Sequence, residues 1–367
     1  MFNIDRRVIN HFDFTLPLLL LPLLILSHTL ISQTNEVLAQ RQSAHFAIAF
    51  VVYIFVFFFP VRKYSNFIEP AYWIGIVLLV LVEFFGVTKL GATRWLTIPF
   101  THFTIQPSEL IKPLFLMVFA HKITQKPPED GGYELKDFLR LSVYIIVPFI
   151  LIAKEPDLGT ALVLLLVGYG ILFIIGVQWK IWASILLIIA ISSPLVYTHL
   201  IKDYQKKRIH DFMSEKPSYH VQQSIIAIGS GGINGQTTEA STQTQLKFLP
   251  IATSDFIFAY LVESYGFVGG TGLILLYLII IYHLLSLNLF LEKNYFIRVF
   301  ANGIALLLFF NVAVNIAMVI GYAPVVGLPL PMFSYGGSSL INYVVLFALL
   351  ENIVTFRFLY KYYDRSM

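Results

Sequence analysis

Cysteine is absent from the 367 residues of this chain, and charged side chains make up only 13% of them. Without thiols, the chain cannot form disulfides, use a catalytic thiolate or bind a metal through cysteine. The small charged fraction accompanies 57% hydrophobic residues, which excludes a soluble globular protein. The formal net charge of +4 does not indicate a nucleic-acid partner, because basic residues in so apolar a chain first report membrane topology.

Familiar catalytic signatures are missing as well. The chain has no Walker A motif, GxGxxG fingerprint, HExxH pair or GxSxG elbow, so nucleotide-binding and hydrolase functions lose their usual support. Internal repeats, low-complexity segments and a separate soluble domain are also missing. What remains is a succession of apolar runs of about 17–25 residues, the length that a helix needs to cross a bilayer.

These runs predict an all-α membrane protein, a polytopic bundle of about ten transmembrane helices that forms one domain over residues 1–367. The first run, Phe14 to Ser32, is too long for the core of a signal peptide and no small-residue cleavage site follows it, so we expect it to be retained. The predicted spans cover residues 14–33, 44–60, 67–86, 107–122, 140–153, 160–177, 181–199, 256–287, 299–321 and 339–358.

The basic residues of the short loops predict which side of the membrane each loop faces. If Arg6 and Arg7 lie inside, most Lys and Arg of the short loops also lie inside, as the positive-inside rule requires. Both termini are then cytoplasmic, in a multi-pass protein of the cytoplasmic (inner) membrane. Apart from residues 126–137, which we interpret as a flexible connector on the inside, the segments rich in Gly, Pro and polar residues fall outside, which predicts an extracytoplasmic functional face. These segments are residues 87–106, 154–159, 200–254 and 323–338.

The large loop of residues 200–254 joins the seventh and eighth predicted spans, and Asp255 follows it at the start of the eighth. An acid at this position can cap the helix by accepting hydrogen bonds from backbone N–H groups. It can also act as a general base, because partial desolvation at the lipid–water boundary raises the pKa of a carboxyl. From the residues alone the two roles stay equal alternatives. Weaker candidates for the base, which we interpret as solvated loop residues, are Asp203, Asp211, Glu215, His220 and Glu239.

Two arginines on the predicted outer side suit an anionic substrate. Arg208 follows Lys206 and Lys207, and the planar guanidinium of an arginine matches phosphate oxygens. The two lysines are interpreted as a solvated or headgroup-binding pair. Arg94 stands beside Trp95 and alone would be an interfacial anchor, but together with Arg208 it could clamp a pyrophosphate.

Several ionisable residues lie within the predicted spans. Glu109 and Lys112 are three residues apart on one helix face, which predicts a structural ion pair or, alternatively, a pair that lines a water-filled cavity. Glu263 lies about two turns beyond Asp255 on the same predicted helix, and we expect it to line the same cavity. Glu351 lies near a helix end, where we expect solvation.

Two other outer loops carry polar residues. Asp157 precedes the sixth span in the string KEPDLGTA, and a helix N-cap explains it well. The string GLPLPMFSYGGSS, residues 327–339, places Ser334 beside two prolines and two adjacent glycines. This composition suits a re-entrant turn that points backbone donors at an anion, or alternatively a plain irregular loop at a helix break.

Eight segments, in order along the chain, are GATRWL (91–96), QPSELIK (106–112), PDLGTA (156–161), YQKKRI (204–209), YHVQQSIIAIGSGG (219–232), TQLKFLP (244–250), SDFIFAYLVESYGFVGG (254–270) and GLPLPMFSYGGSS (327–339). Together they resemble the SEDS family (shape, elongation, division and sporulation) of bacterial cell-wall polymerases. The resemblance spans nearly the whole chain, and each segment falls in the loop or helix where the family has it. The TQLKFLP segment is more similar to the elongation branch of the family than to the division branch.

The resemblance implies a glycosyltransferase that polymerises lipid II, the undecaprenyl-pyrophosphate-linked disaccharide-peptide, into glycan strands outside the membrane. It also implies a class B penicillin-binding protein as transpeptidase partner, other proteins of the elongation complex and membrane lipid. The catalytic acid of the family falls on Asp255. Substrate-binding roles fall on Arg94, Glu109, Lys112, Asp157, Arg208, Gln223, Ser224 and Ser334, and Glu263 is added from its place in the eighth span.

The expected reaction is an inverting glycosyl transfer in which Asp255 accepts the proton of the acceptor hydroxyl. Arg208, with Arg94 and Lys112 or a divalent cation (Mg or Mn), would stabilise the departing pyrophosphate. The alternative is a flippase that moves the lipid-linked precursor across the membrane, because charges at membrane depth often mark transport paths. A third possibility, a non-catalytic scaffold, leaves the loop with Asp255 and Arg208 unexplained.

Overall fold

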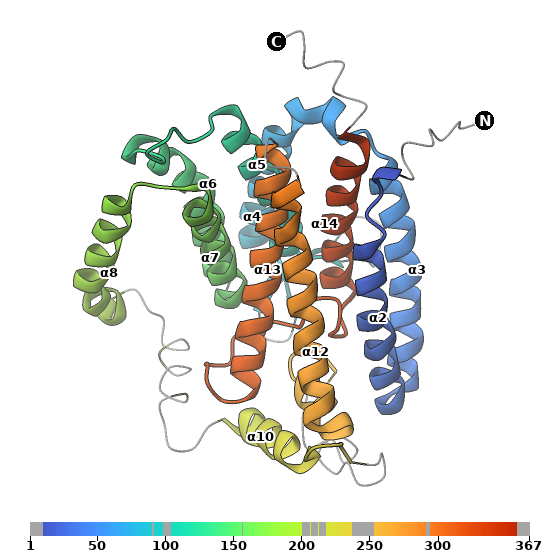
Figure 1. Ribbon diagram of the computed structural model, residues 1–367. Helices are drawn as coiled ribbons and strands as arrows, with labels where there is room; N and C mark the ends of the chain where they lie inside the picture. Colours follow the sequence, from blue (N-terminus) through green and yellow to red (C-terminus); the bar gives the residue numbers. More distant parts are fainter. Residues whose placement is uncertain are drawn as a thin grey trace.

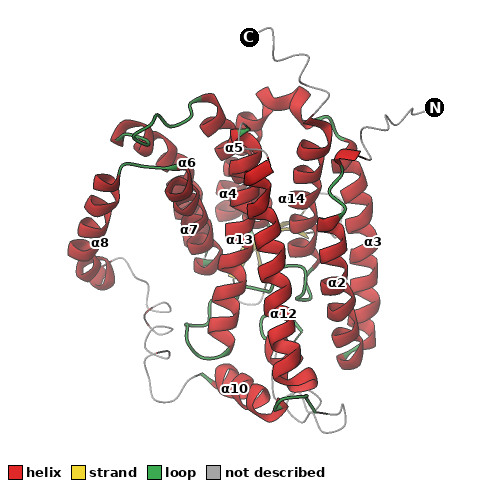
Figure 2. Ribbon diagram, in the orientation of Figure 1, coloured by secondary structure: helices red, strands yellow, loops and turns green. Residues whose placement is uncertain are grey.

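The computed structural model describes residues 10–89, 92–97, 104–155, 157–199, 206, 212, 218–236, 253–290 and 294–357 of the chain. Most of these residues are helical (Figure 1, Figure 2). Largely apolar helices are the expected outcome in a membrane, since a helix satisfies its own backbone polar groups and can expose its side chains to lipid. The protein is an all-α, polytopic membrane protein, as its hydropathy predicts.

Ten long helices in the described part of the chain correspond to the ten predicted spans. Seven stretches of the described residues are long and apolar enough to cross a membrane; α5, α6 and α8 fall outside this group. Both α5 and α6 carry several charged residues. The helices are α2 (Thr15–Thr34), α3 (Glu36–Phe58), α4 (Ile68–Phe85), α5 (Pro107–Gln125), α6 (Leu135–Lys154), α7 (Leu158–Ile175), α8 (Trp179–His199), α12 (Ile257–Phe290), α13 (Tyr295–Val319) and α14 (Gly337–Thr355), with a 3-10 helix at Val61–Phe67.

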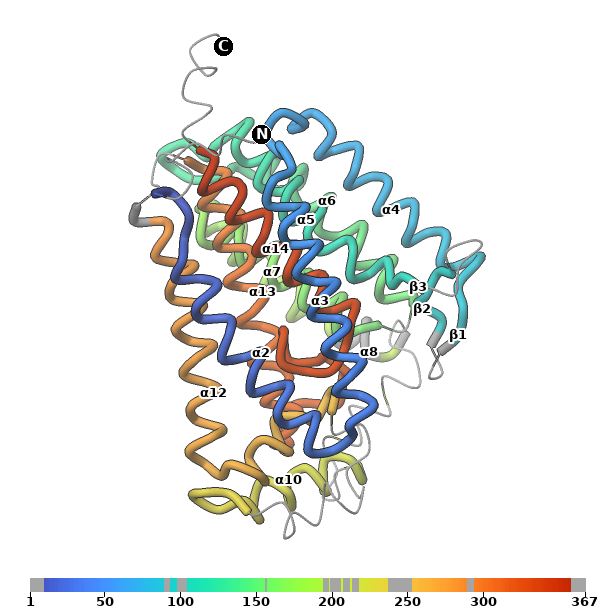
Figure 3. The backbone as a smooth tube through the Cα atoms, turned by 90° about the vertical axis from the view of Figure 1, so that its right-hand side faces the viewer, coloured from blue at the N-terminus to red at the C-terminus, as the bar shows by residue number. Residues whose placement is uncertain are grey.

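The bundle has two ends that differ in structure. The helix α2 begins and α14 ends at one of them, which we call the Asp13 end after the residue that precedes α2 there (Figure 1). At the opposite end, the α10 end, helix α10 (Tyr219–Gly231) lies across the lower parts of α12 and α13 (Figure 1, Figure 3). The centre is formed by α5, α13 and α14, whose residues are largely buried. A central α5 can hold charged side chains because much of its surface faces protein rather than lipid.

Gly266 interrupts α12 with a φ of 67°, a conformation that favours glycine. In a straight helix residues twelve apart are separated by about 18 Å, yet a side chain added at Gly270 would meet the ring of Phe258 at 3.5 Å. The first part of α12, residues 257–265, therefore folds back against the second. The predicted eighth span thus contains a reversal that hydropathy does not reveal, and Asp255 lies inward from the α10 end.

A small antiparallel sheet occupies the connection between α4 and α5, which the sequence predicted only as an outer loop (Figure 3). Its strands, in the order β1-β2-β3, are β1 (Val87–Lys89), β2 (Ala92–Thr97) and β3 (Thr104–Ile105). The strands are rich in Thr and also contain Val, Trp and Ile, residues that favour the extended conformation. Gly86 permits the close turn out of α4, because a Cβ there would lie 2.6 Å from Thr93 Cγ2. The sheet carries Arg94 to the ends of α6 and α7.

The segment between α13 and α14, residues 320–336, folds back into the bundle, and we call it the re-entrant segment. Ser27 Oγ of α2 donates to Phe333 O, and the hydroxyl of Tyr277 in α12 donates to Pro331 O at 2.7 Å. These bonds hold the backbone of the segment between two helices. The burial matches the re-entrant turn, the first of the two alternatives predicted from the sequence. The buried residues are Leu328, Leu330, Pro331, Met332, Phe333 and Ser334.

Glu351 corrects one expectation, since it is not solvated. Its side chain is 1% exposed, and its Oε2 accepts the backbone N–H of Asp13 at 3.3 Å. The carboxylate of Asp13 also hydrogen-bonds His283 of α12 at 2.5 Å. The expectation was wrong because a hydropathy plot locates the end of a helix but not the residues that cover it. Here the residues that lead into α2 cover the end of α14.

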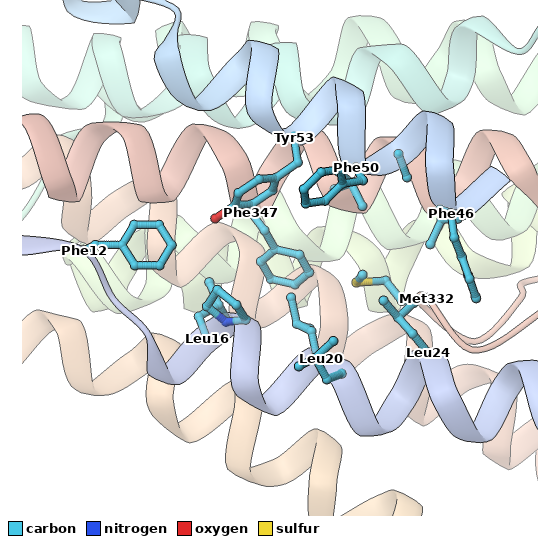
Figure 4. A pocket seen from close by; sticks show the side chains of 14 residues that line it. Phe12, Leu16, Leu20, Leu24, Phe46, Phe50, Tyr53, Met332 and Phe347 are labelled. Carbon is cyan, nitrogen blue, oxygen red and sulfur yellow. The ribbon is translucent and has the colours of Figure 1, made fainter. Parts of the chain in front are cut away.

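An apolar groove of about 300 Å³ opens between α2, α3 and α14 (Figure 4). Phe12 and Tyr53 line one end of it, and Leu24 and Phe46 line the other. Met332 reaches the groove from the re-entrant segment. All three helices are long and apolar enough to cross a membrane, so the groove is an apolar surface that borders the re-entrant segment.

Candidate active site

The backbone around Asp255 is held by hydrogen bonds from distant parts of the chain. The side-chain amide of Asn315, in α13, donates to Asp255 O at 2.8 Å and to Leu328 O at 2.6 Å. Ser334 Oγ donates to Ser254 O at 2.6 Å. The position of Asp255 is therefore fixed jointly by α13 and the re-entrant segment.

The carboxyl of Asp255 faces the re-entrant segment, and the residue is half-buried. A Cβ added at Gly327 would lie 3.6 Å from Asp255 Oδ2. Burial raises the pKa of Asp255 above its usual range, while a hydrogen bond with Ser254 and the charge of Arg94 oppose the rise and Asp157 adds to it. A carboxylate whose pKa is raised in this way is a stronger base than a solvated one.

Arg94 and Asp157 come together beside Asp255 although β2 and α7 are far apart in the sequence. Arg94 Nε donates to Glu155 O at 3.2 Å, and its guanidinium lies 3.7 Å from Asp157 Oδ1. The side-chain amide of Gln106, just before α5, donates to Asp157 Oδ2 at 3.4 Å. Residues from three segments therefore converge on the start of α7.

Asp157 has two roles in this geometry. Its Oδ1 accepts the backbone N–H of Thr160 at 3.3 Å, so it caps α7 as the sequence predicted. It also pairs with Arg94 and acts on the pKa of Asp255. A Cβ added at Gly159 would lie 3.0 Å from Leu328 Cγ, which shows how closely the start of α7 packs on the re-entrant segment. By capping α7, the side chain of Asp157 is therefore held in place at the candidate site.

Glu109 and Lys112 form a separate cluster. Lys112 Nζ is 2.5 Å from Glu109 Oε1, and the side-chain amide of Asn342 in α14 donates to Glu109 Oε2 at 3.3 Å. The two residues are 8% and 4% exposed. This geometry fits the structural ion pair, the first of the two predicted alternatives, because the charges are neutralised within the bundle and tie α5 to α14.

The remaining predicted substrate-binding residues lie apart from Asp255 or act through their backbone contacts. Ser224 of α10 is fully buried and donates to Val319 O at 2.7 Å, which anchors α10 to the last turn of α13. Ser334 holds the backbone of Ser254, as described above. Glu263 is fully buried in the first arm of α12, and its backbone carbonyl accepts the N–H of Gln236 after α10 at 2.9 Å. Gln223 is half-buried in α10.

Arg208 lies outside the described residues, so its predicted place beside the pyrophosphate stays a prediction. Sequence reasoning passed over two residues that the structure brings to the site, Gln106 and Glu155. Both belong to strings that had drawn attention, QPSELIK and KEPDLGTA. What could have singled them out is their position, since each stands at a helix end within three residues of a residue already chosen.

The matching family model is described as "Cell cycle protein" (FtsW/RodA/SpoVE), and it covers residues 7–358. The peptidoglycan glycosyltransferase MrdB of Helicobacter pylori (strain J99) is 50% identical over 357 residues, which cover 97% of this chain and 93% of that protein. The peptidoglycan glycosyltransferase MrdB of Escherichia coli (strain K12) is 37% identical over 358 residues, which cover 95% and 94%.

Solved structures share the fold. A chain in a study of the structural coordination of polymerization and crosslinking by a peptidoglycan synthase complex superposes with a TM-score of 0.82 at 27% identity, over 95% of this chain and 98% of that one. The rod shape determining protein RodA of Thermus thermophilus gives a TM-score of 0.71 at 26% identity, with the same coverage. The similarity therefore extends over nearly the whole bundle.

Proposed function

This chain belongs to the FtsW/RodA/SpoVE family, and we propose that it is a peptidoglycan glycosyltransferase that polymerises lipid II during cell elongation. The two relatives named above are called peptidoglycan glycosyltransferases, and both are MrdB proteins. The observation that carries the proposal is the half-buried Asp255 carboxyl, whose pKa is raised and which lies within the field of Arg94 and Asp157.

The proposed chemistry is an inverting glycosyl transfer. Asp255 accepts the proton of an acceptor sugar hydroxyl while that oxygen attacks the anomeric carbon of the donor. The bond between the anomeric carbon and the undecaprenyl pyrophosphate breaks, and its electron pair leaves with the pyrophosphate. Arg94, together with Arg208, stabilises the negative charge on the leaving group, an effect typically worth a few kcal/mol per donor. Lys112 contributes less than the sequence suggested, because Glu109 already neutralises it.

A divalent cation, Mg or Mn, is a further proposal for the leaving pyrophosphate. Within the described residues, no three His, Asp or Glu side chains are grouped so that they could hold a metal ion. A cation here would therefore be bound largely by substrate phosphates, as Mg²⁺ often is in phosphate sites. Polymerisation assayed with a chelator, and then with added Mg or Mn, tests this part of the proposal.

We place the α10 end on the outer side of the cytoplasmic (inner) membrane, with both termini cytoplasmic. The positive-inside pattern of the sequence supports this orientation. The start of α2 and the end of α14 lie together at the Asp13 end, as an even number of membrane crossings requires (Figure 1). A class B penicillin-binding protein is the proposed transpeptidase partner within a larger elongation complex, since a similar chain belongs to a peptidoglycan synthase complex.

The test uses the purified protein with its cognate class B penicillin-binding protein, labelled lipid II and moenomycin, which blocks classical glycosyltransferases. Glycan strands are read as a ladder on a gel. The wild type is expected to give a ladder and Asp255→Asn none. Asp137→Asn is the matched control, because Asp137 lies at the other end of the bundle, where Lys126 Nζ pairs with it at 2.6 Å. A ladder of normal intensity from Asp255→Asn would show that Asp255 is not the general base.

The flippase alternative is separated by supplying lipid II only to the outer leaflet of liposomes that contain the protein. Polymer formed there needs no transport of substrate. The structure gives transport little support, because the buried Glu109 is paired with Lys112 and Asn342 rather than aligned along a path.

A further inference from the structure

A buried carboxyl beside the candidate active site has no role in the mechanism described above. Glu155, which follows the last residue of α6, is 6% exposed. In the described part of the chain, neither of its side-chain oxygens has a hydrogen-bond partner. Burying an ionised carboxylate without partners is strongly unfavourable, so such a group either keeps its proton or meets a ligand.

The charged groups that face Glu155 come from three elements. Asp157 lies two residues further on, Arg94 reaches from β2, and Glu83 reaches from α4. Arg94 binds Glu155 through its backbone carbonyl, at 3.2 Å, and directs its guanidinium to Asp157 Oδ1 at 3.7 Å. Glu83 lies 3.5 Å from Lys154 Nζ. The arginine therefore holds the backbone of Glu155 while it pairs with another acid.

Burial and the neighbouring charged groups together determine whether the carboxyl of Glu155 carries a proton. Burial raises its pKa to about 8; Asp157 adds to the rise, Arg94 opposes it and Glu83 adds to it slightly. At neutral pH the carboxyl is therefore mostly neutral. An ionised Glu155 would instead place another negative charge within reach of Arg94. That charge would compete for the guanidinium and repel a substrate that itself carries a diphosphate.

We infer that Glu155 works in its neutral form as a positioning residue, which leaves the guanidinium of Arg94 to Asp157 and to the diphosphate of the substrate. The inference deepens the proposed function and rests on it. The proton on Glu155 does not enter the glycosyl transfer. Its role is to keep one acid of the site uncharged, so that Arg94 is not shared among more carboxylates than it can neutralise.

The pH dependence of polymerisation tests this inference. Initial rates are measured from pH 6.5 to 9.5 over a range of lipid II concentrations for the wild type, Glu155→Gln and Asp137→Asn. We expect kcat/KM of the wild type to fall about tenfold per pH unit above about pH 8, mainly through KM. Asp137→Asn should follow the wild type. Glutamine mimics the neutral carboxyl, so Glu155→Gln should retain its rate for at least about one further pH unit.

Two results would overturn the inference. One is an alkaline decline in Glu155→Gln that matches the wild type. The other is loss of polymerisation by Glu155→Gln at neutral pH with an unchanged melting temperature, which would mean that the ionised carboxylate or its proton is needed. Failure of the proposed function looks different, since the wild type would then make no polymer at any pH.

Discussion

Two acid clusters among the described residues, one around Glu109 and one around Asp255, balance their charge in opposite ways. Glu109 has a lysine, Lys112, at 2.5 Å and an amide, Asn342, on its other oxygen. In the described part of the chain, Asp255 shares the field of Arg94 with two other acids. Among the described residues, the charges of the first cluster are neutralised, whereas the second contains more acidic than basic side chains.

This difference separates a structural charge from a reactive one. A buried ion pair with all its partners present ties helices together but has no capacity left for a substrate. A buried acid with a raised pKa and a shared cation is poised to exchange protons and to bind an anion or a cation. The sequence predicted the pairing of Glu109 with Lys112 from their spacing, but it could not show that Asp255 shares Arg94 with other acids, because those residues come from distant segments.

The largest expected effect is the loss of polymerisation in Asp255→Asn. General base catalysis contributes about 10²–10⁴-fold to a rate, and the variant should lose at least that much. Its thermal stability should be unchanged or slightly raised, because asparagine removes a buried acid whose ionisation is unfavourable. Turnover and melting temperature measured on the same preparation check both parts. If Asp255→Asn melted at a clearly lower temperature than the wild type, Asp255 would be a structural acid like Glu109, and the contrast between the two clusters would be wrong.

The next effect concerns stability rather than turnover. Lys112→Met leaves Glu109 buried without its cation, which typically costs about 3–5 kcal/mol. Denaturation by SDS or heat measures this loss. The double variant Glu109→Gln/Lys112→Met removes both charges and should recover most of it. If Lys112→Met abolished polymerisation with no loss of stability, Lys112 would belong to the substrate site as the family resemblance implied.

The third prediction concerns how the stability of the wild type and of Glu155→Gln changes with pH. The pKa of this carboxyl is raised from 4.5 in the unfolded chain to about 8 in the folded protein. Between these values the unfolded chain loses the proton while the folded protein keeps it, so the stability of the wild type falls as pH rises from about 4.5 to 8. Glu155→Gln lacks this loss. Its stability advantage should therefore widen across that window, reach a few kcal/mol and stay constant above it.

Melting temperatures of the two proteins at intervals between pH 5 and 9 measure this advantage. The same series on Asp137→Asn is the control, because its carboxyl is paired with Lys126 at the Asp13 end. Parallel curves for the wild type and Glu155→Gln would show that the carboxyl is ionised at neutral pH.

Much of the fold follows from the sequence alone, because length and hydropathy decide where helices cross a membrane. The ten predicted spans all correspond to helices, and the re-entrant segment was one of two alternatives. The reversal at Gly266 did not follow, since an apolar run reads the same whether it continues or folds back. The sheet that carries Arg94 did not follow either, because its strands are only a few residues long.

The site was predicted in part. Asp255, Arg94 and Asp157 were chosen from the sequence, and the structure brings them together. Glu155 was not chosen, because nothing in the string KEPDLGTA shows that its carboxyl is buried without a partner. Burial and pairing depend on how distant segments pack together. A hydropathy plot is computed from neighbouring residues and contains no information about that packing.

The smallest effect concerns Ser224, which the resemblance assigned to the substrate. Its hydroxyl is fully buried and donates to the carbonyl of Val319, one of the acceptors that the end of α13 leaves without a helical partner. Ser224→Ala should cost about 1–2 kcal/mol, because that carbonyl stays buried without a donor. Polymerisation per folded molecule should remain at the wild-type level. Unfolding and turnover measured together distinguish the two roles: a large fall in turnover with unchanged stability would move Ser224 from the structural group to the group around Asp255.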